Sequence, residues 1–309
     1  MRITVSGATG LVGRHLVAKA LARGDEVVAL SRSSDRARSL LGEEVELHEW
    51  RDPQHEPAPP IALQGADAVI HLLGEPVAQR WSSSAKQEIR DSRVLSTQQL
   101  VAGLAGLTVQ RRPSVLVSGS ATGFYGPRGE EPVDERDQPG HDFLADVVVA
   151  WEAQARAATG LGLRVAHSRT GVVLASGEGA LAKMLPPFRL GVGGPVAGGR
   201  QYVPWIHLDD MAGALLHCAG QNAAAGPVNL TAPNPVTNAE LSRVLGRVLH
   251  RPAVLPVPGA AVKLLYGEMA SIVTGGQRAV PTRLQELGYN FIHPELQPAL
   301  QDVLGSSGG

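Results

Sequence analysis

A glycine-rich turn near the start of the chain constrains the fold more than any other feature. The segment Gly7-Ala8-Thr9-Gly10-Leu11-Val12-Gly13 follows a short apolar run at residues 3–5 and opens a segment with helical apolar spacing. In the order strand, turn, helix, the first glycine permits a tight turn and the second lets a pyrophosphate approach the backbone. The third lets the helix pack close to the sheet, and the helix N-terminus offers amide donors to an anion. The segment therefore predicts a dinucleotide-binding site.

Strand and helix patterns alternate six times along the first half of the chain. After the first strand, apolar runs predict strands at residues 26–31, 45–49, 68–73, 114–118 and 164–170. Segments typical of helices lie between them, among them residues 84–104 and 142–159. This alternation predicts an α/β fold with a Rossmann-type doubly wound parallel sheet.

From about residue 175 the composition of the chain changes, and glycine and proline become frequent. We predict a Rossmann core over residues 1–175, with 200–232 returning to it, and a smaller C-terminal α/β substrate lobe over 176–304. Residues 305–309 are predicted to be a flexible end. Further helices are expected at 181–190, 209–220, 260–273, 281–287 and 294–304, and one begins after Thr237, which has cap character.

Composition restricts the class of protein. The chain of 309 residues is 43% hydrophobic and has a formal net charge of −1, so it can bury a sizeable core and is not expected to bind nucleic acid. It has no apolar run of the roughly 20 residues that a membrane span needs. The single cysteine, Cys218, excludes an intramolecular disulfide and is expected to be buried. No signal peptide precedes the first strand, so we predict a cytoplasmic monomer or homodimer that binds a small-molecule substrate.

The end of the second predicted strand bears on the choice of cofactor. An NAD site usually places an acidic residue here to hold the ribose 2′-hydroxyl. This strand instead ends in Ser31-Arg32-Ser33-Ser34, although Asp35 lies nearby. Arg32 can stack on adenine and pair with a 2′-phosphate, which predicts NADP(H) rather than NAD. The alternative is that Arg32 is only a solvated loop charge.

The fourth predicted strand ends at Leu72-Leu73-Gly74-Glu75. Cofactors in open parallel sheets lie across the carboxyl ends of the strands, so these residues should border the nicotinamide half. Glu75 could act as an acid or base, or could bond a ribose hydroxyl or loop amides. On the following helix, Arg93 could either face solvent or turn inward to the cofactor.

The fifth predicted strand ends in a hydroxyl-rich turn at residues 118–126. Ser120, or alternatively Ser118, and Tyr125 are the hydroxyls expected nearest a substrate and are the candidate catalytic residues. Tyr125 could equally be a structural residue of the turn. No group of histidine, cysteine and acidic residues has metal-ligand spacing, so no metal site is predicted.

Three further residues are given structural roles. Asp209 follows His207 and is predicted to cap the next helix rather than to join a catalytic pair. Trp151 is predicted to be a packing residue, and Glu152 to pair with a nearby arginine.

In combination, these motifs resemble the extended short-chain dehydrogenase/reductases, which include the nucleotide-sugar epimerases. The more detailed likeness is to the atypical epimerase-like subgroup with a short C-terminal domain of unknown function, and it covers essentially the whole chain. The motifs that carry it are the glycine turn, Tyr125-Gly126, Trp205-Ile206-His207-Leu208-Asp209-Asp210, Gly74-Glu75-Pro76, Trp151-Glu152 and residues 86–93, 187–191 and 288–291. The resemblance implies a Rossmann core, bound NADP(H) and an unassigned substrate. It places cofactor contacts at Gly7, Thr9, Gly10, Leu11, Val12, Gly13, Ser31, Arg32, Leu72, Leu73, Glu88 and Arg93.

One departure from the superfamily pattern concerns the mechanism. The usual tyrosine is followed four residues later by a lysine that lowers the tyrosine pKa, but no Tyr-x-x-x-Lys occurs in this chain. Tyr125 without a lysine would keep a pKa of about 10, so it could donate a hydrogen bond but would be a poor base. Two functions therefore stay open. One is an NADP-dependent oxidoreductase or epimerase that transfers hydride with a small carbonyl or sugar-like substrate. The other is a non-catalytic NADPH-binding or redox-sensing protein.

Overall fold

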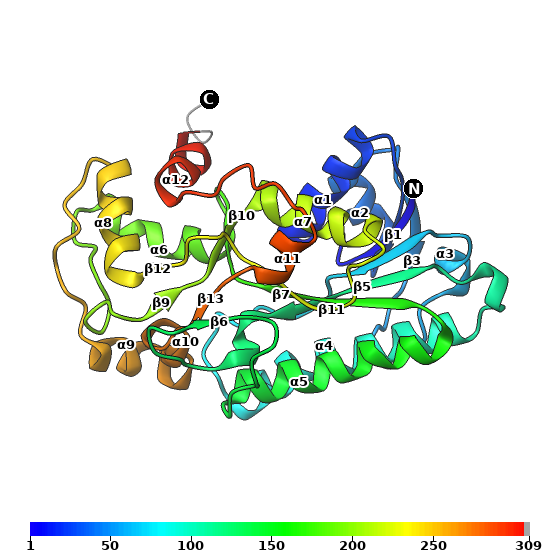
Figure 1. Ribbon diagram of the computed structural model, residues 1–309, viewed down its shortest axis with the longest axis horizontal. Coiled ribbons are helices and arrows are strands. Elements are labelled where there is room, and N and C mark those ends of the chain that lie inside the picture. Colours follow the sequence, from blue (N-terminus) through cyan, green and yellow to red (C-terminus); the bar gives the residue numbers. More distant parts are fainter. Residues whose placement is uncertain (306–309) are drawn as a thin grey trace.

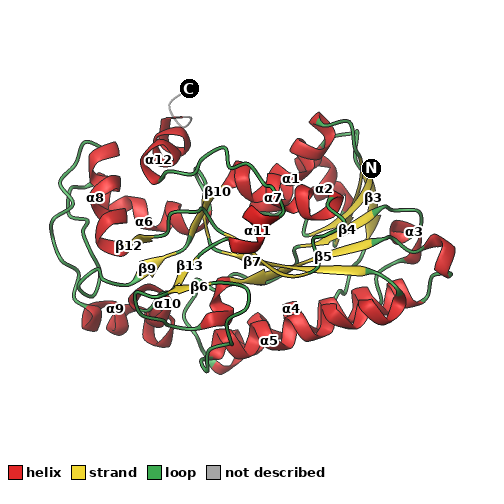
Figure 2. Cartoon of the chain, in the orientation of Figure 1, coloured by secondary structure: helices red, strands yellow, loops and turns green. Residues whose placement is uncertain are grey.

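A central sheet with helices on both faces forms the core of the computed structural model, which describes residues 1–305 (Figures 1 and 2). Its seven strands run in the order β11-β7-β5-β4-β1-β2-β3, and all neighbours are parallel. They are β1 Arg2–Ser6, β2 Glu26–Ser31, β3 Glu46–Glu49, β4 Ala68–His71, β5 Val115–Ala121, β7 Arg164–Thr170 and β11 Gly226–Leu230. The predicted Rossmann-type doubly wound sheet is confirmed. The strand order reverses between β1 and β4, which is where such sheets bind ligands.

Two hydrophobic cores lie on opposite faces of the sheet because successive strand residues point to opposite sides. Ile3 and Val5 of β1 pack with α1 and α7, whereas Val28 and Leu30 of β2 face the core formed with α3 and α4. Figure 1 shows α4 and α5 side by side on one face and α1 and α7 on the other. These helices are α1 Leu11–Ala22, α2 Ser34–Leu41, α3 Pro60–Leu63, α4 Ser83–Ala105, α5 Phe143–Arg156 and α7 Leu208–Gly220.

A smaller lobe with its own core extends from the carboxyl ends of the strands. It contains two-stranded pairs and helices around Trp205 and Leu300. The strands of the pairs are β6 Pro132–Val133, β8 Val172–Leu174, β9 Tyr202–Val203, β10 Trp205–His207, β12 Val236–Thr237 and β13 Arg278–Ala279. The helices of the lobe are α6 Gly179–Arg189, α8 Asn238–Val248, α9 Gly259–Tyr266, α10 Ala270–Thr274 and α12 Leu296–Gly305. Helix α11 Thr282–Glu286 instead packs on β11 of the central sheet. The exact division between core and lobe stays a prediction.

The structure corrects three details of the predicted helices. The helix predicted at 260–273 is broken at Gly267, whose φ of 62° ends α9. Asp209 does not cap α7; His207 is the N-cap, and its Nδ1 accepts a hydrogen bond from the Asp209 amide at 3.1 Å. A ring nitrogen thus takes the place of the usual side-chain oxygen. Helix α12 includes Gly305, which was predicted to be flexible, while 306–309 lie outside the described residues.

Other local predictions are confirmed. Thr237 caps α8 by accepting a hydrogen bond from the Glu240 amide at 3.2 Å. Cys218 is buried in the core. Within residues 1–305, no helix combines the length and the apolar character needed to cross a membrane.

Candidate functional site

The turn between β1 and α1 has room only for glycine at two positions. Gly7 has a φ of 73°, and a Cβ there would lie 2.8 Å from the Leu72 carbonyl carbon. A Cβ on Gly13 would lie 2.2 Å from the Gly7 carbonyl oxygen. Gly10 is exposed and its amide donates to the same oxygen at 3.1 Å. The turn is therefore closely packed on the side that faces Leu72 and the start of α1. Its other side is exposed at Gly10, so its backbone is free to bind a ligand.

Helix α1 begins at this turn without a side-chain cap. Its first amides point out of the helix end and have no intrahelical acceptor. Arg14, one turn into the helix, donates to the Thr9 carbonyl oxygen at 2.9 Å and stabilises the turn. An uncapped N-terminus of a 12-residue helix fits a pyrophosphate, which would accept from these amides.

The end of β2 lies beside the glycine turn, because Leu30 pairs with Ser6 of β1. Ser31 accepts a hydrogen bond from the Ser33 amide at 3.3 Å, which shapes the bend after the strand. Arg32 is exposed and forms no ion pair with any residue of the described chain. Its guanidinium can therefore meet an anion without losing a protein partner.

The end of β4 brings the next group of predicted residues to the same edge. Leu72 and Leu73 are half-buried, and Gly74 and Glu75 are exposed. Arg93 turns inward and packs under this loop, so that a Cβ on Gly74 would lie 2.9 Å from the Arg93 Cζ. Burial lowers the pKa of Arg93 to about 10, which the charge of Glu75 opposes. Arg93 thus places a positive charge beneath the crevice, while its contact with a cofactor stays a prediction.

Glu88, which is also predicted to bind the cofactor, contacts a different part of the chain. It is exposed on α4 and accepts a hydrogen bond from Gln54 Nε2 at 2.8 Å. Gln54 belongs to the connection after β3, so this contact joins α4 to the far edge of the sheet. Its role in cofactor binding also stays a prediction.

The candidate catalytic hydroxyls belong to a buried polar cluster at the end of β5. Ser120 donates to Glu152 Oε1 at 2.6 Å, and Arg169 holds the same carboxylate through Nε at 2.8 Å and Nη2 at 3.0 Å. Arg169 also donates to the Tyr125 hydroxyl at 3.1 Å, and Tyr125 donates to Asn229 Oδ1 at 2.7 Å. The predicted pairing of Glu152 with an arginine is confirmed.

The burial of this cluster bears on its chemistry. Tyr125 is 0% exposed, and burial raises its pKa to about 12 although Arg169 acts in the opposite direction. Burial alone would also raise the pKa of Glu152, but the hydrogen bonds and charge of Arg169 outweigh it and lower that pKa. The hydroxyl protons of Ser120 and Tyr125 are both donated within the protein. This placement favours the structural alternative for Tyr125 over the catalytic one.

A second buried network, which sequence reasoning missed, lies beneath the crevice around His71. Its Nδ1 lies 2.6 Å from Ser6 Oγ, and its Nε2 lies 3.0 Å from Thr97 Oγ1. Thr97 donates its own proton to the Arg93 carbonyl oxygen and accepts from Trp151 Nε1. Nε2 of His71 must therefore be the protonated nitrogen, and Nδ1 accepts from Ser6. Burial lowers the pKa of His71 to about 3, so a neutral imidazole ties β1 and β4 to α4 and, through Trp151, to α5.

The start of α6 connects the two sides of the crevice opening. Glu178, just before α6, pairs with Arg14 of α1 at 2.7 Å. Lys183 donates from α6 to the Ala78 carbonyl oxygen at 2.7 Å, in the loop that follows β4. The lobe therefore bridges the glycine turn and the end of β4, where the substrate side of such a crevice would lie.

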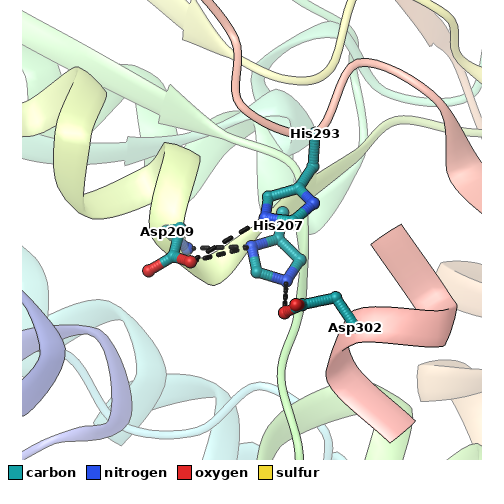
Figure 3. A group of neighbouring side chains, drawn as sticks. All are labelled: His207, Asp209, His293 and Asp302. Atoms are coloured by element: carbon teal, nitrogen blue, oxygen red, sulfur yellow. Dashed lines mark hydrogen bonds and ion pairs between the residues drawn. The ribbon is translucent and has the colours of Figure 1, made fainter. Parts of the chain in front are cut away.

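A histidine and aspartate group lies at the junction of β10, α7 and α12 (Figure 3). His207, Asp209, His293 and Asp302 each offer one ligand atom, and these atoms lie within 4.8 Å of one another. Sequence reasoning predicted no metal site because the spacing within any one segment shows none. His207 and Asp209 are two positions apart, but His293 and Asp302 follow His207 by 86 and 95 positions, so only the fold could bring the four together.

Comparison with known proteins agrees with this geometry. Residues 3–230 match the NAD dependent epimerase/dehydratase family, and residues 257–303 match a domain of unknown function, DUF1731. The chain belongs to the NAD dependent epimerase/dehydratase family. This confirms the family resemblance seen in the sequence.

Particular relatives share nearly the whole chain. The epimerase family protein SDR39U1 of Homo sapiens is 36% identical, over 98% of this chain and 100% of the relative. The chloroplastic SDR39U1 homolog of Arabidopsis thaliana is 38% identical, over 98% of this chain and 87% of the relative. The crystal structure of human SDR39U1 (isoform 2) with NADPH superposes with a TM-score of 0.87 at 34% identity and covers 99% of both chains. A nucleoside-diphosphate sugar epimerase from Corynebacterium glutamicum gives a TM-score of 0.76 at 32% identity, over 99% of this chain and 58% of that one.

Proposed function

We propose that the chain binds NADP(H) across the carboxyl ends of β1, β2 and β4. The observation that carries this proposal is the glycine cradle, in which Gly7 and Gly13 leave no space for a Cβ and α1 begins uncapped. The pyrophosphate would accept hydrogen bonds from the amides at Leu11, Val12 and Gly13. The NADPH in the structure of human SDR39U1 supports the same assignment for this chain.

We infer that Arg32 and Ser31 select NADP(H) over NAD(H). Arg32 is exposed, is not engaged in an ion pair within residues 1–305, and follows the β2 strand at the position that reads the adenosine ribose. A guanidinium there can pair with the charge of a 2′-phosphate. Leu72 and Leu73, with Gly74 and Glu75, would border the nicotinamide end.

We further propose an oxidoreductase or epimerase activity on a small carbonyl or sugar-like substrate that proceeds without a tyrosine–lysine relay. When bound, NADPH would supply a hydride to a carbonyl carbon, whereas NADP⁺ would first accept a hydride from a sugar carbinol carbon in an epimerisation and then return it. Ser120 and Tyr125 donate their protons to Glu152 and Asn229, so the new alcohol takes its proton from water. The bridge that α6 makes from Arg14 to Ala78 supports this proposal, because it places residues of the lobe beside the crevice, where they could hold a substrate.

A second function is favoured by the same buried cluster. Because Ser120 and Tyr125 are both used internally and no Tyr-x-x-x-Lys occurs, the chain could hold NADPH as a bound ligand or redox sensor without chemistry. The two functions share one cofactor site. They differ in whether the bound nicotinamide reacts.

A turnover experiment separates the two functions. The full chain is incubated with NADPH and a panel of small carbonyls, and separately with NADP⁺ and a panel of nucleotide sugars. The change in reduced nicotinamide and the appearance of epimeric sugars are followed. An oxidoreductase or epimerase gives turnover with at least one class, and Ser120→Ala should change the rate by less than about tenfold, far short of the loss expected from removing an acid–base residue. No change in either form of the nicotinamide and no epimeric sugar across both panels, with tight cofactor binding, would instead establish the non-catalytic function. A loss of a hundredfold or more in Ser120→Ala, with NADPH affinity intact, would contradict the proposed water route.

A further inference from the structure

Beyond the cofactor site, the histidine and aspartate group beside α7 has the composition of a metal site. Asp209 Oδ2 lies 3.9 Å from His207 Nδ1 and 3.8 Å from His293 Nε2. The imidazole rings of His207 and His293 stack with their centroids 3.7 Å apart. Donor atoms of a tetrahedral zinc site are about 3.3 Å apart when the bonds are about 2 Å long, so the two distances to Asp209 are about half an ångström too long. The ring centroids must also separate to about 5 Å, so His293 must rotate away from His207 for both rings to bind one ion.

A second observation points to the same group. His207 is 4% exposed, and its Nε2 is buried without a hydrogen-bond partner in the described chain. This atom points to Asp302 Oδ2 at 3.3 Å. A buried polar atom without a hydrogen bond normally costs stability, so its position needs an explanation.

We propose that His207, Asp209 and His293 bind one Zn²⁺ ion, and that Asp302 orients His207. Two imidazoles and a carboxylate are donors that suit zinc, and the two carboxylates of the group offset the charge of the ion. Such a site has three protein ligands and leaves one position for water.

The two ring nitrogens of His207 have different roles in this arrangement. Nδ1 accepts a hydrogen bond from the Asp209 amide, so this nitrogen carries no proton and its lone pair points at the start of α7. The zinc ion takes this lone pair in place of the amide. Nε2 keeps its proton, and a small rotation of the ring on zinc binding would bring it into a hydrogen bond with Asp302. A carboxylate in this position commonly orients a ligating histidine.

The neighbouring residues hold two of the ligands in place. His15 of α1 lies 2.5 Å from Asp209 Oδ1 and leaves Oδ2 facing the histidines. Asp210 accepts from the backbone amides of Ile292 and His293, each at 2.8 Å. The main chain at His293 is therefore fixed by bonds that need no metal, so little ordering is required when the ion binds.

A zinc ion here would join the core to the C-terminal segment. Asp209 is on α7, which packs on α1, whereas His293 and Asp302 belong to the segment that contains α12. Zinc binding should therefore raise the unfolding temperature, because it stabilises the state in which α12 is docked.

Zinc titration of the full chain tests the proposal. Chelator-treated protein is titrated with ZnCl₂ by calorimetry, and the metal content is checked by mass spectrometry. We expect one ion per chain and a higher unfolding temperature. His293→Gln should weaken binding at least a hundredfold, and Asp302→Asn by about 10- to 100-fold, as expected for a residue that orients a ligand.

A matched control uses an exposed histidine that also has a carboxylate neighbour. His55 lies 2.9 Å from Asp52 on the surface, and His55→Gln should keep full zinc binding. The unfolding temperature of each variant without zinc shows whether it is folded, and the visible spectrum with Co²⁺ reports tetrahedral coordination independently. The proposal is overturned if the wild-type chain binds no stoichiometric zinc, or if folded His293→Gln binds it as tightly as the wild type does.

Discussion

Replacing Gly13 by alanine is expected to abolish NADPH binding. The new Cβ would lie 2.2 Å from the Gly7 carbonyl oxygen and 2.7 Å from the Ala8 Cα, and both are backbone atoms that cannot rotate away. Either the turn or the start of α1 must shift, and the cradle for the pyrophosphate is lost. We expect the Kd for NADPH to rise by more than about 100-fold, equivalent to about 2.7 kcal/mol.

The same substitution should lower stability, because overpacking against rigid backbone typically costs about 1 to 3 kcal/mol. Fluorescence titration with NADPH and urea unfolding measure the two effects. Gly160→Ala is the matched control, since a Cβ there meets nothing within 4 Å. An unchanged Kd in Gly13→Ala would show that the turn is not the cofactor site.

Replacing Glu152 by glutamine is expected to cause the largest loss of stability. Glu152 is 2% exposed and Arg169 is 3% exposed, so the guanidinium would stay buried without its counter-charge. Removing one partner of a buried ion pair costs about 3 to 5 kcal/mol, because the remaining charge is uncompensated. Urea unfolding should show a loss of this size in Glu152→Gln.

A surface ion pair provides the comparison. Glu240 lies 3.4 Å from Arg243 on the exposed face of α8, and Glu240→Gln should change stability by less than about 1 kcal/mol. Near-equal losses in the two variants would mean that the buried cluster at the end of β5 is not organised by charge. The outcome also bears on function, since Ser120 and Tyr125 bond to this same pair.

Much of the fold and of the candidate cofactor site could be predicted from local sequence. The glycines of the turn, the apolar strands and the position of Arg32 depend on neighbours within a few residues, and the parallel sheet then brings the strand ends together. The order of the strands was not predicted and comes from the structure. The break of the predicted helix at Gly267 could not be predicted in this way, because a single glycine inside a helical pattern costs only about 1 kcal/mol and is often tolerated.

The polar clusters could not be predicted in the same way. Tyr125 bonds to Asn229, 104 positions away, and His207 meets Asp302 across almost as many residues. No spacing rule covers such pairs, because they depend on how β11 and α12 pack on the rest of the molecule. The capping of α7 by His207 was missed for a different reason. N-cap residues usually accept the hydrogen bond with a side-chain oxygen, whereas here a ring nitrogen of His207 accepts it.

The proposed NADP(H) site predicts that Arg32 selects NADPH over NADH. Both cofactors are titrated into the wild-type chain and into Arg32→Ala at constant ionic strength. We expect the wild type to prefer NADPH, and the variant to lose about 10- to 100-fold in NADPH affinity, the size of a charge-assisted hydrogen bond, while NADH affinity changes little. Equal affinities for the two cofactors in the wild type, or an Arg32→Ala variant that keeps the preference for NADPH, would show that Arg32 does not select the cofactor.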